Sequence, residues 1–290
     1  MSQRYADGKM SRRLLVNTDL DATLLDHDSY SWEPAREALD ALREHTCPLV
    51  LNSSKTLAEM RELAKELQLN YPLVCENGAM IAFPKDGDDL EASRWSAVAD
   101  LHDEGDYWVK YLGASRAKAV EVIHELRTQN AEFAFEGYSD WSAEKVAELT
   151  HLPIEKARLS KERLGTEPII WSGSDEALQA FTAEVQAKGL QVLKGGRFLH
   201  VSGMGDKAQG LLELAYIYRE LETDVQWVTV ALGDSPNDER MLSVADIAVV
   251  IPNDTELRPT ADQVIFAEDA GPTGWNKCMN LIINQQLTPY

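Results

Sequence analysis

The segment LLVNTDLDAT, residues 14–23, places two acidic residues directly after an apolar run. The run Leu14–Thr18 is typical of a buried strand, and Asp19 and Asp21 lie in the turn that follows it. In open parallel sheets, ligands bind beyond the carboxyl ends of the strands. The segment therefore predicts a central strand that ends at an acidic site. Taken alone, this motif is also compatible with a solvated acidic turn that has no functional role.

The chain after this strand alternates between helical and extended patterns. Apolar residues recur at helical spacing in Pro34–Glu44 and Thr56–Leu67. Short apolar runs typical of strands are Pro48–Asn52, Leu73–Cys75 and Met80–Phe83. Strands that alternate with single helices indicate βαβ units and a parallel sheet.

The alternation ends after Pro84 and returns near residue 203. Lys85–Asp89 is a candidate polar linker, and the region after it mixes helices and strands less regularly. We therefore predict an α/β fold: a Rossmann-like parallel-sheet core of residues 1–85 and 203–290, with an inserted α+β domain at 86–202. The other predicted elements are helices at Ala114–Gln129, Ser142–Thr150, Asp175–Lys188, Lys207–Glu220 and Asp238–Val244, and strands at Pro168–Ser172, Leu190–Leu193, Arg197–Val201, Val225–Leu232, Ile247–Ile251 and Gln263–Phe266.

A second acidic motif, GDSPND at residues 233–238, follows the predicted strand Val225–Leu232. Its two outer carboxylates, Asp234 and Asp238, can converge on a cation, and Mg²⁺ prefers such hard oxygen ligands. An Asx turn before a helix N-cap is the alternative for this loop alone.

Hydroxyl groups and lysines occur at two predicted helix starts. Ser53, Ser54 and Lys55 follow the second strand, and a helix N-terminus with hydroxyls and a lysine can hold a phosphate. For that segment alone, a serine N-cap is the alternative. Lys207 begins the helix after the insert, and its alternative is an exposed surface lysine.

Composition excludes several classes of partner. The 290 residues include 28 basic and 48 acidic side chains, a formal net charge of −20. Such a surface repels nucleic acid and anionic lipid, so neither is an expected partner. The sequence has no apolar run near the length of a membrane span and no signal-peptide pattern at its start, and its three cysteines lack metal-ligand spacing. We therefore expect a cytoplasmic protein.

The four motifs, taken in chain order, resemble those of the haloacid dehalogenase superfamily of phosphatases. The resemblance implies a core with an inserted cap, residues 86–202, that closes over the substrate. It implies that Asp19 is a nucleophile that forms an aspartyl-phosphate, and that Asp21 is the acid and base. It further implies Mg²⁺ held by Asp19, the Asp21 carbonyl, Asp234 and Asp238, and phosphate held by Ser53, Ser54 and Lys207.

A narrower resemblance is to the mannosyl-3-phosphoglycerate phosphatases. It is carried by the segments SSKT (53–56), ENGA (76–79), TEP (166–168) and GGRF (195–198), with His200. It implies hydrolysis of a mannosyl- or glucosyl-3-phosphoglycerate to a glycosylglycerate, a compatible solute, as in mannosylglycerate biosynthesis. Lys55, Arg158, Glu167 and Arg197 are candidate substrate residues, each with a structural role as its alternative.

Two positions depart from these families. Ala22 stands where glycine is common, and because alanine disfavours positive φ, we expect a turn that avoids it. Thr166 stands where serine is often found. The rival functions are another sugar-phosphate phosphatase, either sucrose-phosphate-like or of broad specificity, and a non-catalytic sugar-phosphate sensor. A monomer or a homodimer is expected.

Overall fold

The computed structural model describes residues 10–87, 90, 93–195 and 197–287, and the chain divides into two compact units. Unit 1 comprises Met1–Ser53 and Lys207–Tyr290, and unit 2 comprises Ser54–Asp206. Among the described residues, no helix is long and apolar enough to cross a membrane.

The sheet of unit 1 consists of parallel strands in the order β13-β12-β11-β1-β2. Its middle strands are apolar over most of their length, and buried residues such as Val16 and Val230 are fully covered, as expected for a sheet with helices on both faces. The strands are β1 (Ser11–Thr18), β2 (Leu49–Asn52), β11 (Val225–Gly233), β12 (Ile247–Val250) and β13 (Gln263–Phe266).

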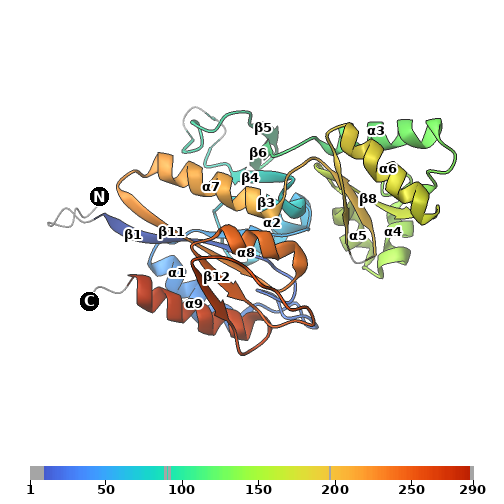
Figure 1. The fold of residues 1–290 in the computed structure, drawn as a ribbon. Helices are drawn as coiled ribbons and strands as arrows, with labels where there is room; N and C mark the ends of the chain where they lie inside the picture. The colour runs from blue at the N-terminus through green and yellow to red at the C-terminus, as the bar shows by residue number, and fades with distance from the viewer. Residues whose placement is uncertain (1–9, 88–89, 91–92, 196, 288–290) are drawn as a thin grey trace. The chain divides into compact units, whose positions relative to one another are not determined.

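Helices cover both faces of this sheet (Figure 1). α1 packs against α9 on one face, and α7 packs against α8 on the other. The predicted Rossmann-like α/β core is therefore confirmed. The helical elements of unit 1 are η1 (Glu33–Ala35), α1 (Arg36–Glu44), α7 (Lys207–Leu221), η3 (Pro236–Asp238), α8 (Glu239–Val244) and α9 (Gly271–Leu287).

Unit 2 contains two antiparallel arrangements of strands. In the first, the strands are neighbours in the order β3-β4-β6-β5, and in the second the order is β7-β8-β10-β9. The strands are β3 (Leu73–Cys75), β4 (Met80–Pro84), β5 (His102–Glu104), β6 (Tyr107–Tyr111), β7 (Phe135–Gly137), β8 (Thr166–Trp171), β9 (Gln191–Lys194) and β10 (Leu199–Ser202).

The helices of unit 2 pack on the second sheet through two apolar clusters. One cluster joins α3 and α6 to β7 and β8 around Phe135 and Phe181. The other joins α4 and α5 around Trp141, so core packing accounts for this tryptophan. The helical elements are α2 (Leu57–Glu66), η2 (Glu76–Gly78), α3 (Arg116–Gln129), α4 (Ala143–Thr150), α5 (Ile154–Lys161) and α6 (Asp175–Ala187). The mixed α+β composition predicted for the insert is confirmed.

The buried carboxylate of Glu76 ties β3 to the segment before β8. Glu76 is 1% exposed and has a φ of 52°, in the left-handed region. Its Oε1 accepts a hydrogen bond from the Leu164 amide at 2.7 Å, and its Oε2 accepts from the Thr166 amide at 2.8 Å and hydroxyl at 2.6 Å. A serine would supply the same hydroxyl, so Thr166 keeps the interaction that this position needs.

The two compact units divide the chain at 53/54 and 206/207. Within unit 2, β4 pairs with β6, and Glu76 accepts hydrogen bonds from the segment before β8. The boundaries of the core and the cap at 85/86 and 202/203 stay a prediction. The predicted linker Lys85–Asp89 falls partly outside the described residues. The predicted hairpin of β9 and β10 is present, although Gly196 in its turn is not described.

Candidate active site

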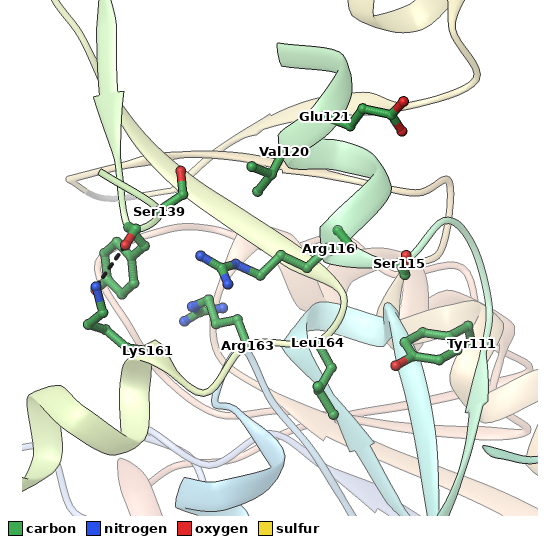
Figure 2. Close-up of a pocket in the computed structure, with 11 residues that line it drawn as sticks. Tyr111, Ser115, Arg116, Val120, Glu121, Ser139, Lys161, Arg163 and Leu164 are labelled. Carbon is green, nitrogen blue, oxygen red and sulfur yellow. Dashed lines mark hydrogen bonds between the residues drawn. The ribbon is translucent and has the colours of Figure 1, made fainter. Parts of the chain in front are cut away.

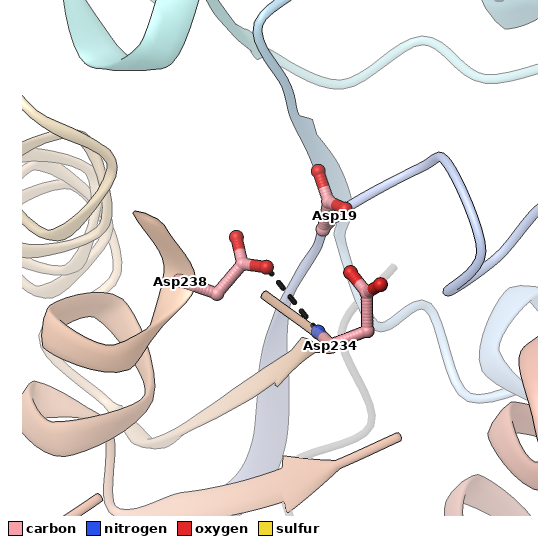
Figure 3. A group of neighbouring side chains, drawn as sticks. All are labelled: Asp19, Asp234 and Asp238. Atoms are coloured by element: carbon pink, nitrogen blue, oxygen red, sulfur yellow. Dashed lines mark hydrogen bonds between the residues drawn. The ribbon is translucent and has the colours of Figure 1, made fainter. Parts of the chain in front are cut away.

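Parallel pairing of β1 and β11 brings Asp19 and Asp234 to the same edge of the sheet. Thr18 lies opposite Leu232, and the Asp19 amide donates a hydrogen bond to the Leu232 carbonyl at 2.9 Å. Each acidic residue therefore follows the end of its strand. Among the described residues, Asp19, Asp234 and Asp238 each offer a carboxylate oxygen within 4.8 Å of the others (Figure 3).

Lys207 is buried within this acidic group. Its Nζ lies 2.6 Å from Oδ1 of Asp19 and 2.6 Å from Oδ1 of Asp238. Asn52, at the end of β2, donates a hydrogen bond from Nδ2 to the Lys207 carbonyl at 3.0 Å. The surface-lysine alternative for Lys207 is therefore wrong, because the start of α7 lies in the acidic site.

The site concentrates more negative than positive charge away from water. Burial, with the nearby Asp238, raises the pKa of Asp19 to about 7, although Lys207 opposes this shift. Burial and Asp238 also raise the pKa of Asp234. Burial alone would lower the pKa of Lys207, but Asp19 and Asp238 raise it overall, so the ammonium stays protonated. One further cation would stabilise these carboxylates.

Asp238 uses both carboxylate oxygens to hold its neighbours. While Oδ1 accepts from Lys207, Oδ2 accepts from the Asp234 amide at 3.2 Å and from the Ser235 amide at 3.1 Å. Gly233 makes this loop possible, because a Cβ there would lie 2.5 Å from the Asp238 Cβ. The loop is therefore an ordered support for Lys207 and Asp234, and not only a turn before a helix.

Asp234 is oriented from two sides. Thr23 donates a hydrogen bond from its hydroxyl to Oδ1 at 3.2 Å, and Asn253 donates from Nδ2 to Oδ2 at 2.5 Å. Thr23 belongs to the first acidic motif, so the two motifs support each other. Asn253 was not among the predicted residues: it lies after β12, where a single asparagine is a common loop residue.

The turn between Asp19 and Thr23 corrects one expectation. Ala22 has a φ of 58°, so the turn does not avoid positive φ. Such a conformation costs an alanine about 1–2 kcal/mol. A hydrogen bond of 2.8 Å from the Leu25 amide to the Leu20 carbonyl closes the turn around it. Asp21 is half-buried in this turn.

The donor set fits a hard divalent cation. Carboxylate oxygens are the protein ligands that Mg²⁺ prefers, and a second cation beside Lys207 would offset the excess negative charge. Asp19, Asp234 and Asp238 each offer a carboxylate oxygen to such an ion, although each of them also accepts hydrogen bonds from neighbouring side chains. Asp21 lies outside the group of carboxylates that the described residues form; its expected contribution is its backbone carbonyl.

Residues 16–269 match the model of a protein family described as haloacid dehalogenase-like hydrolase. The chain belongs to this family. The predicted membership and the predicted phosphatase class are confirmed. Two relatives are named glucosyl-3-phosphoglycerate/mannosyl-3-phosphoglycerate phosphatase. The protein of Methanococcoides burtonii is 38% identical over 272 residues, 92% of this chain and 97% of the relative. The protein of Persephonella marina is 32% identical over 277 residues, 94% of this chain and 98% of the relative.

Solved structures share the fold of this haloacid dehalogenase-like hydrolase. A phosphatase of the same superfamily from Bacteroides thetaiotaomicron has a TM-score of 0.64 at 19% identity, over 97% of this chain and 98% of that one. The sucrose-phosphatase of Synechocystis has a TM-score of 0.58 at 14% identity, over 96% of this chain and 100% of that one. At these identities the likeness concerns the fold alone.

The serine-rich segment spans the point in the chain of this hydrolase where the first part of unit 1 ends and unit 2 begins. Ser53 is buried at the end of unit 1, directly after β2, and Ser54 and Lys55 are half-buried at the start of unit 2. Thr56 caps α2: its hydroxyl accepts a hydrogen bond from the Glu59 amide at 3.2 Å. The serine N-cap alternative is therefore wrong, because the threonine does this work.

The predicted substrate residues of the insert lie in different environments. Glu167 is fully buried, and its carboxylate accepts hydrogen bonds from Arg116 at 2.7 Å and from the Ser139 amide at 2.6 Å. Arg158 is exposed on α5 and pairs with Glu155 at 3.3 Å. Arg197 is exposed between β9 and β10. Their role in binding the substrate stays a prediction.

A different set of cations lines a cavity in unit 2. Arg116, Lys161 and Arg163 all border it, and none was predicted. They lie on two segments of the chain: Arg116 is at the start of α3, and Lys161 and Arg163 are at and just after the end of α5. The one sequence signal is that Lys161 and Arg163 come shortly before the TEP segment at 166–168.

Proposed function

We propose that this chain is a Mg²⁺-dependent phosphomonoester hydrolase that acts on glucosyl- or mannosyl-3-phosphoglycerate. The products would be inorganic phosphate and the glycosylglycerate, a compatible solute. Two relatives, each matched over nearly its whole length, bear the name of a phosphatase for these compounds, which supports this substrate. The observation that carries the reaction class is the buried group of Asp19, Lys207 and Asp234 at the ends of β1 and β11.

The geometry suits Asp19 as the nucleophile. Its carboxylate is at the end of a rigid central strand, and Lys207 at 2.6 Å favours the ionised form that attacks phosphorus. Attack forms an aspartyl-phosphate as the bond from phosphorus to the substrate oxygen breaks. Lys207 lies where charge accumulates on the phosphoryl oxygens, and we propose that Ser53 and Ser54 donate hydrogen bonds to the same group.

Asp21 is proposed to move the protons. It would donate one to the leaving alkoxide and then accept one from the water that hydrolyses the aspartyl-phosphate. When bound, Mg²⁺ would reduce the repulsion between the Asp19 carboxylate and the phosphate dianion. Asp238 acts indirectly, because it positions Lys207 and the loop that carries Asp234.

Substrate selection is proposed to belong to residues 86–202. The four reaction motifs lie outside this insert, so its side chains are free to recognise the sugar and the glycerate. The three free and buried cysteines suit a reducing compartment, and we propose a cytoplasmic location with a monomeric or homodimeric protein.

A substrate panel tests the proposed function. Phosphate release would be measured with glucosyl- and mannosyl-3-phosphoglycerate, sucrose phosphate, glucose 6-phosphate and p-nitrophenyl phosphate, with and without Mg²⁺. We expect the highest kcat/KM for the glycosyl-3-phosphoglycerates and no turnover after chelation. Faster turnover of sucrose phosphate or a hexose phosphate would refute the substrate, and no phosphate release at all would favour a sugar-phosphate sensor.

The role of Asp21 has its own test. Asp21→Asn should slow turnover of the glycosyl-3-phosphoglycerate at least about a hundredfold, since alkoxides leave poorly without an acid. The p-nitrophenyl phosphate reaction needs less acid and should lose clearly less. Comparing kcat for the two substrates in the wild type and the variant decides this, and equal losses would argue against Asp21 as the acid.

A further inference from the structure

Unit 2 contains a cavity of about 740 Å³ that the reaction motifs do not use (Figure 2). This volume is in the range of small-molecule sites. The cavity lies between the start of α3, the residues after β7 and the residues after α5. The polar residues of its wall include Tyr111, Ser115, Arg116, Ser139, Lys161 and Arg163.

The cationic side chains of this wall converge. Figure 2 shows the guanidinium groups of Arg116 and Arg163 close together and extending toward the side on which the Lys161 amine lies. The Lys161 Nζ donates a hydrogen bond to the Tyr138 carbonyl at 2.8 Å and another to the Trp141 carbonyl, and it forms no ion pair with any described residue. Its direct partners are therefore neutral carbonyl groups, and the carboxylates of Glu167 and Glu144 act on it from a longer distance.

Arg163 has an unused donor in a buried position. Its side chain is 8% exposed, and Nη1 donates a hydrogen bond to the Thr166 hydroxyl at 2.7 Å. Its Nε is buried and has no hydrogen-bond partner among the described residues. A buried, unpartnered donor on a cation is costly unless a ligand satisfies it.

The direct ion pairs around the cavity do not include Lys161. Glu167 pairs with Arg116 at 2.7 Å, and Glu76 lies 3.6 Å from Arg163. Glu121, which also lines the cavity, is 68% exposed and pairs with Lys118. Burial, and next the charge of Arg116, lower the pKa of Lys161, although the charges of Glu167 and Glu144 oppose this shift.

We propose that this cavity binds the carboxylate of the glycerate part of the substrate, an inference that rests on the proposed function. The planar guanidinium groups match a carboxylate, and Lys161, which forms no ion pair with any described residue, adds a third charged donor beside them. The hydroxyl groups of Tyr111 and Ser115 offer hydrogen bonds to neighbouring substrate oxygens.

Kinetics of full-length Lys161→Met test the proposal. We expect kcat/KM for glucosyl-3-phosphoglycerate to fall about ten- to a hundredfold, the loss of one charge-assisted hydrogen bond, and kcat/KM for p-nitrophenyl phosphate to change less than about threefold. Lys188→Met, which removes an exposed cation of the same unit, is the matched control and should change neither. Equal losses on both substrates, or a selective loss in Arg197→Ala but not in Lys161→Met, would overturn the proposal.

Ligand-observed NMR provides a readout that does not depend on turnover. D-glycerate should bind the wild type, glycerol should not, and Lys161→Met and Arg163→Lys should both weaken D-glycerate binding at least about fivefold. Binding of inorganic phosphate should be unchanged in these variants. No D-glycerate binding by a wild type that hydrolyses glycosyl-3-phosphoglycerates would overturn the cavity proposal alone. Binding that depends on Lys161, in a protein that releases no phosphate, would instead overturn the proposed function.

Discussion

Charged side chains are grouped in opposite ways in the two compact units. In unit 1, Asp19, Asp234 and Asp238 surround Lys207, so the carboxylates outnumber the cation among the described residues. In unit 2, the three cations of the cavity wall face Glu76 and Glu167. Burying an uncompensated charge is costly, and a bound ion of the opposite sign removes that cost.

This comparison motivates a different ligand for each unit. The carboxylates of unit 1 suit a divalent metal ion, whereas the guanidinium and ammonium groups of the cavity wall in unit 2 suit an organic anion. A chain with a formal net charge of −20 would otherwise repel a substrate with both phosphate and carboxylate groups. Lys207 and the cations of the cavity wall supply positive charge at the two positions where we propose that such a substrate binds.

The largest expected effect concerns Asp19, the proposed nucleophile of unit 1. Asp19→Asn should lower kcat by about a thousandfold or more, because an amide does not attack phosphorus and no second nucleophile is proposed. Phosphate release under saturating Mg²⁺ measures this, with circular dichroism to verify folding. A folded variant that retains more than about a tenth of the activity would exclude the covalent mechanism and weaken the contrast between the units.

Replacing the buried Lys207 of unit 1 should lower the free energy of unfolding as well as the activity. Lys207→Met leaves Asp19 and Asp238 buried without their shared partner, and the free energy of unfolding in metal-free buffer should fall by about 3–5 kcal/mol. Urea denaturation measures the change. Adding Asp238→Asn should restore part of it, and no recovery in the double variant would show that charge imbalance is not the cause.

In unit 2, the comparable test removes a carboxylate. Glu76→Gln keeps the shape of the side chain but loses the charge that faces Arg163 and the charge-assisted hydrogen bonds from residues 164–166. We expect the free energy of unfolding to fall by about 2–3 kcal/mol. Glu148→Gln, at an exposed position in the same unit, is the control and should change it by less than about 0.5 kcal/mol. Equal effects of the two substitutions would contradict a special role for Glu76.

The smallest expected effect is a pH dependence of the free energy of unfolding, caused by the burial of His200 and the nearby charge of Arg163. Burial, and next the charge of Arg163, lower the pKa of His200 from 6.5 to about 4. The unfolded chain therefore binds the proton more tightly, so the stability that His200 contributes is present above pH 6.5 and is lost as pH falls toward 4. Because the ring is half-buried, we expect a loss of about 1–2 kcal/mol.

The free energy of unfolding of the wild type and of His200→Gln, measured at pH 7.5 and pH 4.5, isolates the contribution of His200. The wild type should lose about 1–2 kcal/mol more than the variant between these two values. Identical pH profiles would contradict this prediction, because they would show that neither burial nor Arg163 makes protonation of the ring costly.

The sequence alone predicted the candidate residues for the reaction. Asp19, Asp21, Ser53 and Asp234 each follow directly after an apolar strand, so the strand pattern itself predicts that they share one edge of a parallel sheet. Such short-range patterns are readable without coordinates, because the strand and its terminal side chains are neighbours in the chain.

The sequence analysis did not predict α9 or α5, because neither segment shows a clear helical pattern of apolar residues. α9 begins with Gly271-Pro272-Thr273-Gly274, residues typical of loops, yet Trp275, Met279 and Ile282 are buried against the rest of unit 1. α5 is short and mostly charged, and among its described residues only Ala157 and Ser160 are buried. Tertiary packing, and not helix propensity, stabilises both.

Only the tertiary structure decided which charges meet. Asn253 reaches Asp234 from another loop, and Arg116, Lys161 and Arg163 come from segments whose composition is ordinary. The local sequence favoured Arg197, which lies in the GGRF segment, over Lys161, which is one of several cations in residues 156–163. Burial and the distance to a counter-charge separate them, and both quantities exist only after the chain has folded.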